Sequence, residues 1–389
     1  MAGEHALLNP SGLKIWSTCT PSARLAEKIE KVDSVYAAEG TTAHVLFQLL
    51  ANRQLKRIRE QNYKIQLEQI KKDIYYNNGM LKYMQAYLSY VMSIYAKALT
   101  IDSNALILIE HKLNLSKYIP GSFGTADVLI FCSGHIWFID LKYGQGIRVE
   151  AEENHQLKAY ALGAIELGRL FFSKIKNISL TIYQPRIDHI DTWETTVDKL
   201  IDWAENDLRA KALMAWKGEG ELVAGEHCRF CAVKPTCRAV RDHNLNIAKK
   251  RFESPKELSE EEISNVVLGS DQVISWLKSV NEYALKEALK GKSFPDLKLI
   301  TARSDRKITD TDKAVSILRK AGYSLEEIYK QPEIKGIGEL EKLLGKDDFN
   351  YYLRSVVKKP YGAPSLVHKD KPGEPYDRMK KAIEKFSQV

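Results

Sequence analysis

Hydrophobic residues recur along the chain with two different spacings, and each spacing predicts one kind of secondary structure. Between residues 43 and 98 the spacing is helical, with a break at Asn77-Asn78-Gly79. After residue 104 the pattern changes to short runs of β-branched and aromatic residues, which are typical of strands. We expect three strands here, the last two of which form a hairpin, at residues 105–109, 126–131 and 135–140.

Helical spacing returns at residues 152–167 and 196–216, and a strand is predicted between them at residues 178–183. A short capped helix is also expected near the start, around Leu13–Trp16. The predicted order is therefore helices, three strands, helix, strand, helix. This order favours an α/β fold in which helices flank a central mixed sheet.

The chain of 389 residues is longer than one typical domain. After residue 245 the sequence becomes charged and helical, and then lysine-rich. We therefore expect a first domain at residues 1–245 and a smaller accessory region of unknown role at residues 246–389.

Composition narrows the class of protein. Lysine and arginine total 58 against 50 acidic residues, a net charge of +8, which is compatible with a polyanionic partner. No run of about 18 apolar residues is present, and the start lacks the pattern of a secretory signal, so we expect a cytoplasmic protein without a membrane partner. Five cysteines in such a chain indicate metal binding more than a disulfide framework.

Carboxylates and a lysine fall near the ends of the predicted strands. Glu110 follows the first strand, Asp127 begins the second, and Asp140 and Lys142 close the third. Because residues two apart on a strand share a face, Asp140 and Lys142 are expected to point the same way. Carboxylates from neighbouring strand ends can converge on a hard cation. An isolated Asp-x-Lys pair, however, is also an ordinary solvated strand end.

A wider ordered set makes the pattern more specific. It consists of Gly40-x-x-x-His44, Glu110, Gly124-Thr-Ala-Asp127, Asp140-Leu141-Lys142 and Gln156-x-x-x-Tyr160. This set resembles the motifs of the RecB-like nucleases in the PD-(D/E)xK superfamily. The resemblance implies a restriction-endonuclease-like central mixed sheet flanked by helices, with a helical insertion at residues 43–98.

The resemblance also implies roles for these residues. His44, Asp127, Asp140 and the backbone carbonyl of Leu141 would bind Mg²⁺ or Mn²⁺, and Lys142 would position the attacking water. Gln156 and Tyr160 would support the site or contact DNA, and Glu110 would act directly or indirectly. For single residues plainer interpretations stay open: His44 as a helix histidine bonded to a carbonyl, Glu110 as an ordinary strand-end carboxylate, and Tyr160 as core packing.

The cysteines form a second constellation. Cys228, Cys231 and Cys237 lie close together, Cys19 is available as a fourth thiolate, and Cys132 is expected to be a buried strand residue. This arrangement resembles the iron-sulfur clasp of AddB-type helicase-nucleases and of CRISPR-associated RecB-like exonucleases. It implies a [4Fe-4S] cluster that ties the first helix to the end of the nuclease domain, with zinc as the alternative.

Together these features predict a metal-dependent deoxyribonuclease, most simply an exonuclease acting on single-stranded or duplex DNA ends in phage or bacterial recombination, repair or processing. A helicase or recombinase is the expected protein partner. Residues 5–8 and 37–44 also resemble phage- and prophage-borne proteins of unassigned function. The alternative is a nucleic-acid-binding or assembly protein that retains a structural metal cluster without cleavage.

A stripe of tyrosines in the helical region has two interpretations as well. Tyr83, Tyr87 and Tyr90 are spaced to share one helix face, with Tyr95 nearby. They would either stack on unpaired bases or pack against the sheet.

Overall fold

The computed structural model describes residues 6–29, 35–144, 147–172, 174–249, 259–298 and 345. The chain divides into two compact units, residues 1–262 with 269–280 and residues 263–268 with 281–389. The second unit lies largely outside the described residues, so the domain boundary at residue 245 stays a prediction. The sheet and the sites discussed below belong to the first unit, whereas α10 (Glu260–Leu289) has residues in both units.

Five strands form one sheet in the order β1-β2-β3-β4-β5. Their bounds are β1 Leu106–Asn114, β2 Phe123–Cys132, β3 His135–Leu141, β4 Asn177–Gln184 and β5 His189–Thr196. β3 and β4 run parallel, and the other neighbours are antiparallel. The parallel pair needs a crossover, which the helix α6 (His155–Gly168) provides. The predicted α/β architecture, a central mixed sheet flanked by helices, is confirmed.

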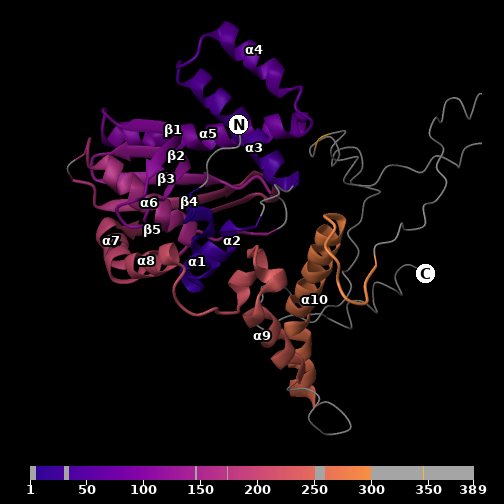
Figure 1. Ribbon diagram of the computed structural model, residues 1–389. Helices are drawn as coiled ribbons and strands as arrows, with labels where there is room; N and C mark the ends of the chain where they lie inside the picture. Colours follow the sequence, from indigo (N-terminus) through magenta and orange to yellow (C-terminus); the bar gives the residue numbers. More distant parts are fainter. Residues whose placement is uncertain are drawn as a thin grey trace, which may run out of the picture. The chain divides into compact units, whose positions relative to one another are not determined.

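Helices cover both faces of this sheet (Figure 1). The core on one face includes buried side chains of α3, α4 and α5, and the core on the other face includes those of α1, α6, α7 and α8. The remaining helical bounds are η1 Pro10–Gly12, α1 Leu13–Thr18, α2 Ser22–Glu27, α3 Val35–Gln54, α4 Glu60–Ile70, α5 Asn78–Ile101, η2 Pro185–Ile187, α7 Val197–Trp203, the π-helical η3 Ala204–Leu208, α8 Arg209–Lys217, η4 Glu226–Phe230, η5 Lys234–Thr236, α9 Arg238–Lys249 and α10 Glu260–Leu289. Among the described residues, no helix is long and apolar enough to cross a membrane.

The local predictions match most of these elements. The break at residues 77–79 is the start of α5, where the Asn77 side chain accepts a hydrogen bond from the backbone of Met80 at 2.8 Å. The hairpin joins β2 to β3 with Cys132 opposite His135. The prediction missed β5, which is polar and half-exposed at the edge of the sheet.

The tyrosine stripe of α5 belongs to the core. Tyr87 is completely buried, and its hydroxyl donates a hydrogen bond to the backbone carbonyl of Ile139 at 3.3 Å. Tyr83, Tyr90 and Tyr95 are partly buried and pack against the same cluster of side chains. Of the two interpretations, packing against the sheet is the one that the structure supports.

Candidate metal centre and adjoining pocket

The site begins at an irregularity in the β1–β2 ladder. Ile109 pairs with Val128 and His111 pairs with Ala126, so Glu110 lies opposite Asp127. Glu110 has a φ of +48°, a left-handed conformation that costs a residue with a side chain on the order of 1–3 kcal/mol. Its position inside β1 corrects the expectation that it ends the strand, and Asp127 likewise lies inside β2.

The irregularity shifts the alternation of side chains by one residue. Before Glu110, Ile107 packs in the core on the α5 side of the sheet, whereas after it Leu113 packs on the α6 side. Regular alternation would place both odd-numbered residues on one face. The shift therefore lets Glu110 join Ile109 in facing α3, where His44 lies.

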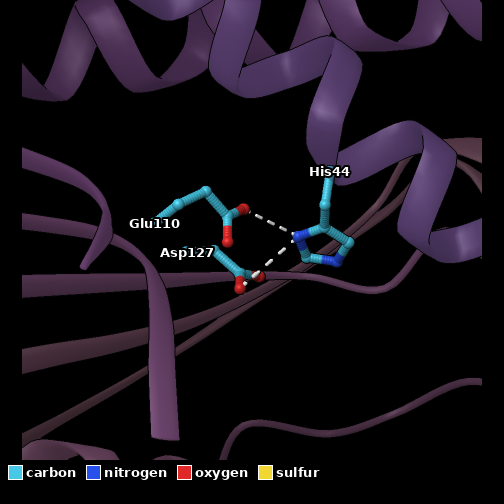
Figure 2. A group of neighbouring side chains, drawn as sticks. All are labelled: His44, Glu110 and Asp127. Carbon is cyan, nitrogen blue, oxygen red and sulfur yellow. Dashed lines mark hydrogen bonds and ion pairs between the residues drawn. The ribbon is translucent and has the colours of Figure 1, made fainter. Parts of the chain in front are cut away.

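His44 projects from α3 toward both strands (Figure 2). Its Nδ1 lies 2.9 Å from Oε1 of Glu110 and 3.5 Å from Oδ1 of Asp127. The ligand atoms of these three residues all lie within 4.8 Å of one another, close enough to hold one metal ion. Glu110 is therefore part of this compact group and is placed to bind an ion directly. The sequence had left open whether its role is direct or indirect.

The charges in this group perturb one another. Burial by itself lowers the pKa of His44, but the carboxylates of Asp127 and Glu110 outweigh burial and raise the pKa to about 9. Burial is also the main reason that the pKa of Asp127 is raised, to about 7, although His44 opposes the change. Without a bound cation, the His44 imidazolium is the positive charge that compensates the carboxylates.

Asp140 and Lys142 close the site at the end of β3. The backbone N–H of Leu141 donates a hydrogen bond to Oδ2 of Asp127 at 2.6 Å, which fixes β3 against β2 at this point. Asp140 is buried, and its Oδ2 lies 2.9 Å from Nζ of Lys142. The pair lacks hydrogen-bond geometry, so this buried oxygen has no hydrogen-bond partner among the described residues. Such an oxygen is costly to bury unless a ligand pairs with it.

The helix α6 supports Lys142 from the other side. Asn154 caps this helix by accepting hydrogen bonds from the backbone of Gln156 and Leu157 at 3.0 and 3.2 Å. The cap orients the first turn, where Oε1 of Gln156 accepts a hydrogen bond from Nζ of Lys142 at 2.8 Å. Lys142 is thus held between a carboxylate and an amide oxygen.

Tyr160 lies one turn further along α6, and its side chain packs mainly in the hydrophobic core. Its ring packs 5.5 Å from Phe138, and burial raises the pKa of its hydroxyl, with the site carboxylates adding to the effect. A Cβ on Gly124 would lie 2.7 Å from the Tyr160 hydroxyl oxygen. The glycine of the Gly124-Thr-Ala-Asp127 motif is therefore required by the tyrosine of the Gln156-x-x-x-Tyr160 motif.

A cavity of about 400 Å³, which we call the α3 pocket, adjoins His44 and Lys142. One wall is the early part of α3, including Gly40 and Thr41, and the other is formed by Tyr143, Ile147 and Val149. The pocket has no signature in the sequence, because these two walls come from segments more than 100 residues apart.

Side chains of β4 and β5 hold the second wall in place. Gln184 donates a hydrogen bond to the carbonyl of Ile147 and accepts one from the backbone of Val149, at 2.9 and 2.8 Å. His189 bonds the carbonyl of Val149 at 3.0 Å, and Asp191 accepts from the backbone of Ala151 at 2.7 Å. The ligand atoms of Glu150, His189 and Asp191 also lie within 4.8 Å of one another, but these backbone bonds explain the grouping.

An ion pair holds the first wall. Nη1 of Arg186, directly after β4, lies 2.7 Å from Oε2 of Glu39 on α3, and its guanidinium stacks 4.9 Å from the centre of the Tyr143 ring. Arg186 was not predicted as part of the site. The pair spans 147 residues, and no local pattern connects the two side chains.

The predicted cysteine set comes from both ends of the first unit. Cys19 ends α1, Cys228 lies in η4, and Cys231 and Cys237 follow η4 and η5. α1 contacts η4, and η4 contacts η5. Burial raises the pKa of the Cys228 and Cys231 thiols, and the other thiols of the set add to the effect, so all four lie within electrostatic range.

Cys132 is separate from this set. It is completely buried in β2 and packs in the core on the α5 side of the sheet, as predicted. None of the five cysteines is in a disulfide.

The chain belongs to the family described as "Protein of unknown function (DUF2800)", whose model matches residues 5–374. Among solved structures, the chain is similar to one titled "Crystal structure of SSO0001" at 14% sequence identity. That match covers 59% of this chain and 95% of the other, with a TM-score of 0.23. At that TM-score the likeness does not bear on the site.

The charge arrangement predicts an unusual titration of His44. In metal-free protein, His44 should keep its proton up to a pH of about 9, because the neighbouring carboxylates stabilise the imidazolium. NMR titration of the imidazole resonances measures this directly. Asp127→Asn and Glu110→Gln should each lower the pKa of His44.

His135 is the internal control, because burial lowers its pKa below the ordinary value. Since the folded pKa of His44 lies above that of an unfolded histidine, about 6.5, its contribution to stability should be lost as the pH rises through about 9. A His44 that titrates no higher than His135 would contradict this charge arrangement.

Proposed function

We propose that the chain is a divalent-metal-dependent DNA nuclease of the RecB-like PD-(D/E)xK class. The observation that carries the proposal is the convergence of His44, Glu110 and Asp127 beside the Asp140–Lys142 pair, at the end of β3. These groups come from separate elements, and three buried or half-buried carboxylates at one point are costly unless a cation compensates them.

The donors suit Mg²⁺ or Mn²⁺. Hard cations prefer carboxylate and carbonyl oxygens, and Mn²⁺ also accepts an imidazole nitrogen. Asp127, Asp140 and His44 are the residues proposed to hold the ion, together with the backbone carbonyl of Leu141 and with Glu110 beside them. The buried Oδ2 of Asp140, which has no hydrogen-bond partner among the described residues, supports this assignment. Such an ion supplies Lewis acidity toward a phosphoryl oxygen and toward a bound water.

The surroundings of the Lys142 ammonium suit a group that stabilises negative charge on a substrate. An ammonium has three N–H groups, and the carboxylate of Asp140 and the amide oxygen of Gln156 approach it at 2.9 and 2.8 Å. Gln156 accepts one of these N–H groups, and the N–H groups that it leaves can orient an attacking water or donate to a phosphate oxygen as negative charge develops there. Gln156 thereby acts as a positioning residue for Lys142, and Tyr160 supports the strand that carries Asp127.

The polarity of the surroundings favours a phosphodiester substrate. Among the described residues that line the α3 pocket, the charged side chains are those of His44 and Lys142, and none is a carboxylate. The proposed substrate is DNA, cut most simply from an end during phage or bacterial recombination, repair or processing. A helicase or recombinase is the proposed partner.

The four cysteines are proposed to hold a [4Fe-4S] cluster. Burial raises the pKa of the Cys228 and Cys231 thiols, and the other thiols of the set lie close enough to raise it further. The pattern of Cys228, Cys231 and Cys237 with a distant Cys19 resembles an iron-sulfur clasp, and zinc is the alternative. Its proposed role is structural, because it would join α1 to the segment after α8.

The nuclease proposal predicts that Asp140→Asn and Lys142→Ala each reduce Mg²⁺- or Mn²⁺-dependent DNA cleavage on the order of 10²-fold or more. The first substitution removes an anionic ligand, and the second removes the ammonium. Cleavage of linear and circular, single- and double-stranded DNA is the measurement. Asp198→Asn and Lys199→Ala, exposed on α7, are the matched controls and should cleave like the wild type.

Thermal unfolding of each variant separates a lost role from a lost fold. A folded Asp140→Asn or Lys142→Ala protein that cleaves at the wild-type rate would overturn the assignment. Wild-type protein that binds DNA but does not cleave it with either metal would favour the non-cleaving alternative.

The cluster proposal predicts that protein purified without oxygen is brown and contains about four iron and four sulfide per chain. Cys19→Ser should lose colour and thermal stability together, because it removes the ligand from the first helix. Cys132→Ser is the matched control and should keep the iron, since Cys132 packs in the core of the sheet. Colourless protein with stoichiometric zinc would reject the iron-sulfur assignment, and iron retained by Cys19→Ser would reject the ligand set.

A further inference from the structure

Gly40 lowers the stability of the helix α3, and no contact among the described residues requires a glycine at this position. It lies within α3, where glycine destabilises a helix by about 1 kcal/mol relative to alanine. A Cβ at Gly40 would meet nothing within 4 Å among the described residues. Gly124 differs, because the ring of Tyr160 occupies the space that its side chain would need.

The space beside Gly40 is the α3 pocket. Gly40 and Thr41 line it on one side, and His44 and Lys142 line it next to the candidate metal centre. A glycine that exposes helix backbone to a pocket is typical of close approach by a ligand. Within the described part of the chain, no contact compensates for the cost of Gly40, and a ligand in the pocket would do so.

The lining of the pocket suits a ligand with an anionic end and an uncharged body. Lys142 and His44 provide positive charge at one end, while Tyr143, Ile147 and Val149 provide an uncharged wall. The carboxylates Glu110, Asp127 and Asp140 do not line the pocket. Asp140 lies 2.9 Å from Nζ of Lys142, so a phosphate that binds from the pocket would share this ammonium with Asp140.

Both walls are fixed before a ligand binds. The Arg186–Glu39 ion pair joins α3 to the segment after β4, and the Gln184 and His189 hydrogen bonds hold residues 147–149. A preformed pocket needs little ordering on binding, which favours affinity.

We propose that the α3 pocket binds one unpaired nucleotide of the substrate, with its phosphate toward Lys142 and its sugar against the backbone of Gly40. This inference rests on the proposed nuclease function and narrows its substrate to unpaired DNA strands or frayed ends. A cavity of about 400 Å³ is in the range that encloses one small ligand. Enzymes that hold a single base in a pocket take it unpaired, because a paired base stays in the stack.

Substitution of Gly40 tests the inference without depending on catalysis. The probe is a short fluorescein-labelled oligothymidine, and its affinity for the full-length protein is measured by fluorescence anisotropy with divalent metal chelated. Gly40→Leu should weaken binding about tenfold or more by filling the pocket, with a smaller loss for Gly40→Ala. Both variants should unfold at the same temperature as the wild type or higher, because each residue favours helix more than glycine does.

Val45→Leu is the matched control, because Val45 is exposed on the same helix and does not line the pocket. It should bind like the wild type. A blunt-ended hairpin duplex should bind the wild type about tenfold more weakly than the oligothymidine.

Each remaining outcome identifies which proposal fails. If the wild type binds and cleaves single-stranded DNA but Gly40→Leu binds it equally well, the pocket assignment is overturned while the nuclease proposal stands. Equal affinity for duplex and single strand would also overturn the pocket assignment. If the wild type neither binds nor cleaves any DNA, the nuclease proposal fails and this inference fails with it.

Discussion

The charge balance around His44 is the constraint on which the rest of the site depends. Three carboxylates, from Glu110, Asp127 and Asp140, are gathered where β1, β2 and β3 lie side by side. In the described part of the chain, the positive charges paired with them are His44 and Lys142. Burial of like charges is unfavourable, and the raised pKa values of His44 and Asp127 are the direct consequence. A bound cation would relieve the same repulsion without retaining protons.

The two faces of the sheet contribute different parts of this arrangement. α3 brings His44 and Gly40 to one face, whereas α6 brings Gln156 and Tyr160 to the other. The residues from α3 and from α6 meet at the end of β3. Asp140 and Lys142 lie on the α6 side of the sheet, where Lys142 donates a hydrogen bond to Gln156. Leu141, between them, donates a backbone hydrogen bond to the carboxylate of Asp127. The left-handed Glu110 completes the site, because the shift in side-chain alternation there turns its carboxylate toward His44 on α3. The local strain at Glu110 thus coincides with the point of highest charge density.

Periodicity predicted the parts of this structure that depend on local sequence. Alternation along β3 was sufficient to place Asp140 and Lys142 on one face, and the change of period after residue 104 located three of the five strands. β5 was missed because its polar side chains make it look like a loop, although Asp191 and Glu194 have partners in the fold. The conformation of Glu110 has no signal in its own side chain, since φ there is set by tertiary contacts.

Contacts between residues far apart in the sequence could not be predicted either. The Arg186–Glu39 ion pair and the Gln184 hydrogen bonds to residues 147–149 form only after the sheet has assembled, so no spacing rule anticipates them. The four-cysteine set was predicted because Cys228, Cys231 and Cys237 are close in sequence and Cys19 is one of only two others. The α3 pocket follows from the assembled walls and from the missing side chain of Gly40.

The central claim is that the carboxylate group around His44 is built for a divalent cation. Crystals of the full chain soaked with Mn²⁺, measured at the manganese absorption edge, test it most directly. The account predicts an anomalous peak bounded by His44, Asp127 and Asp140. An anomalous peak at Glu150, His189 and Asp191 instead, or none at His44 in crystals of protein at saturating Mn²⁺ and alkaline pH, would contradict it.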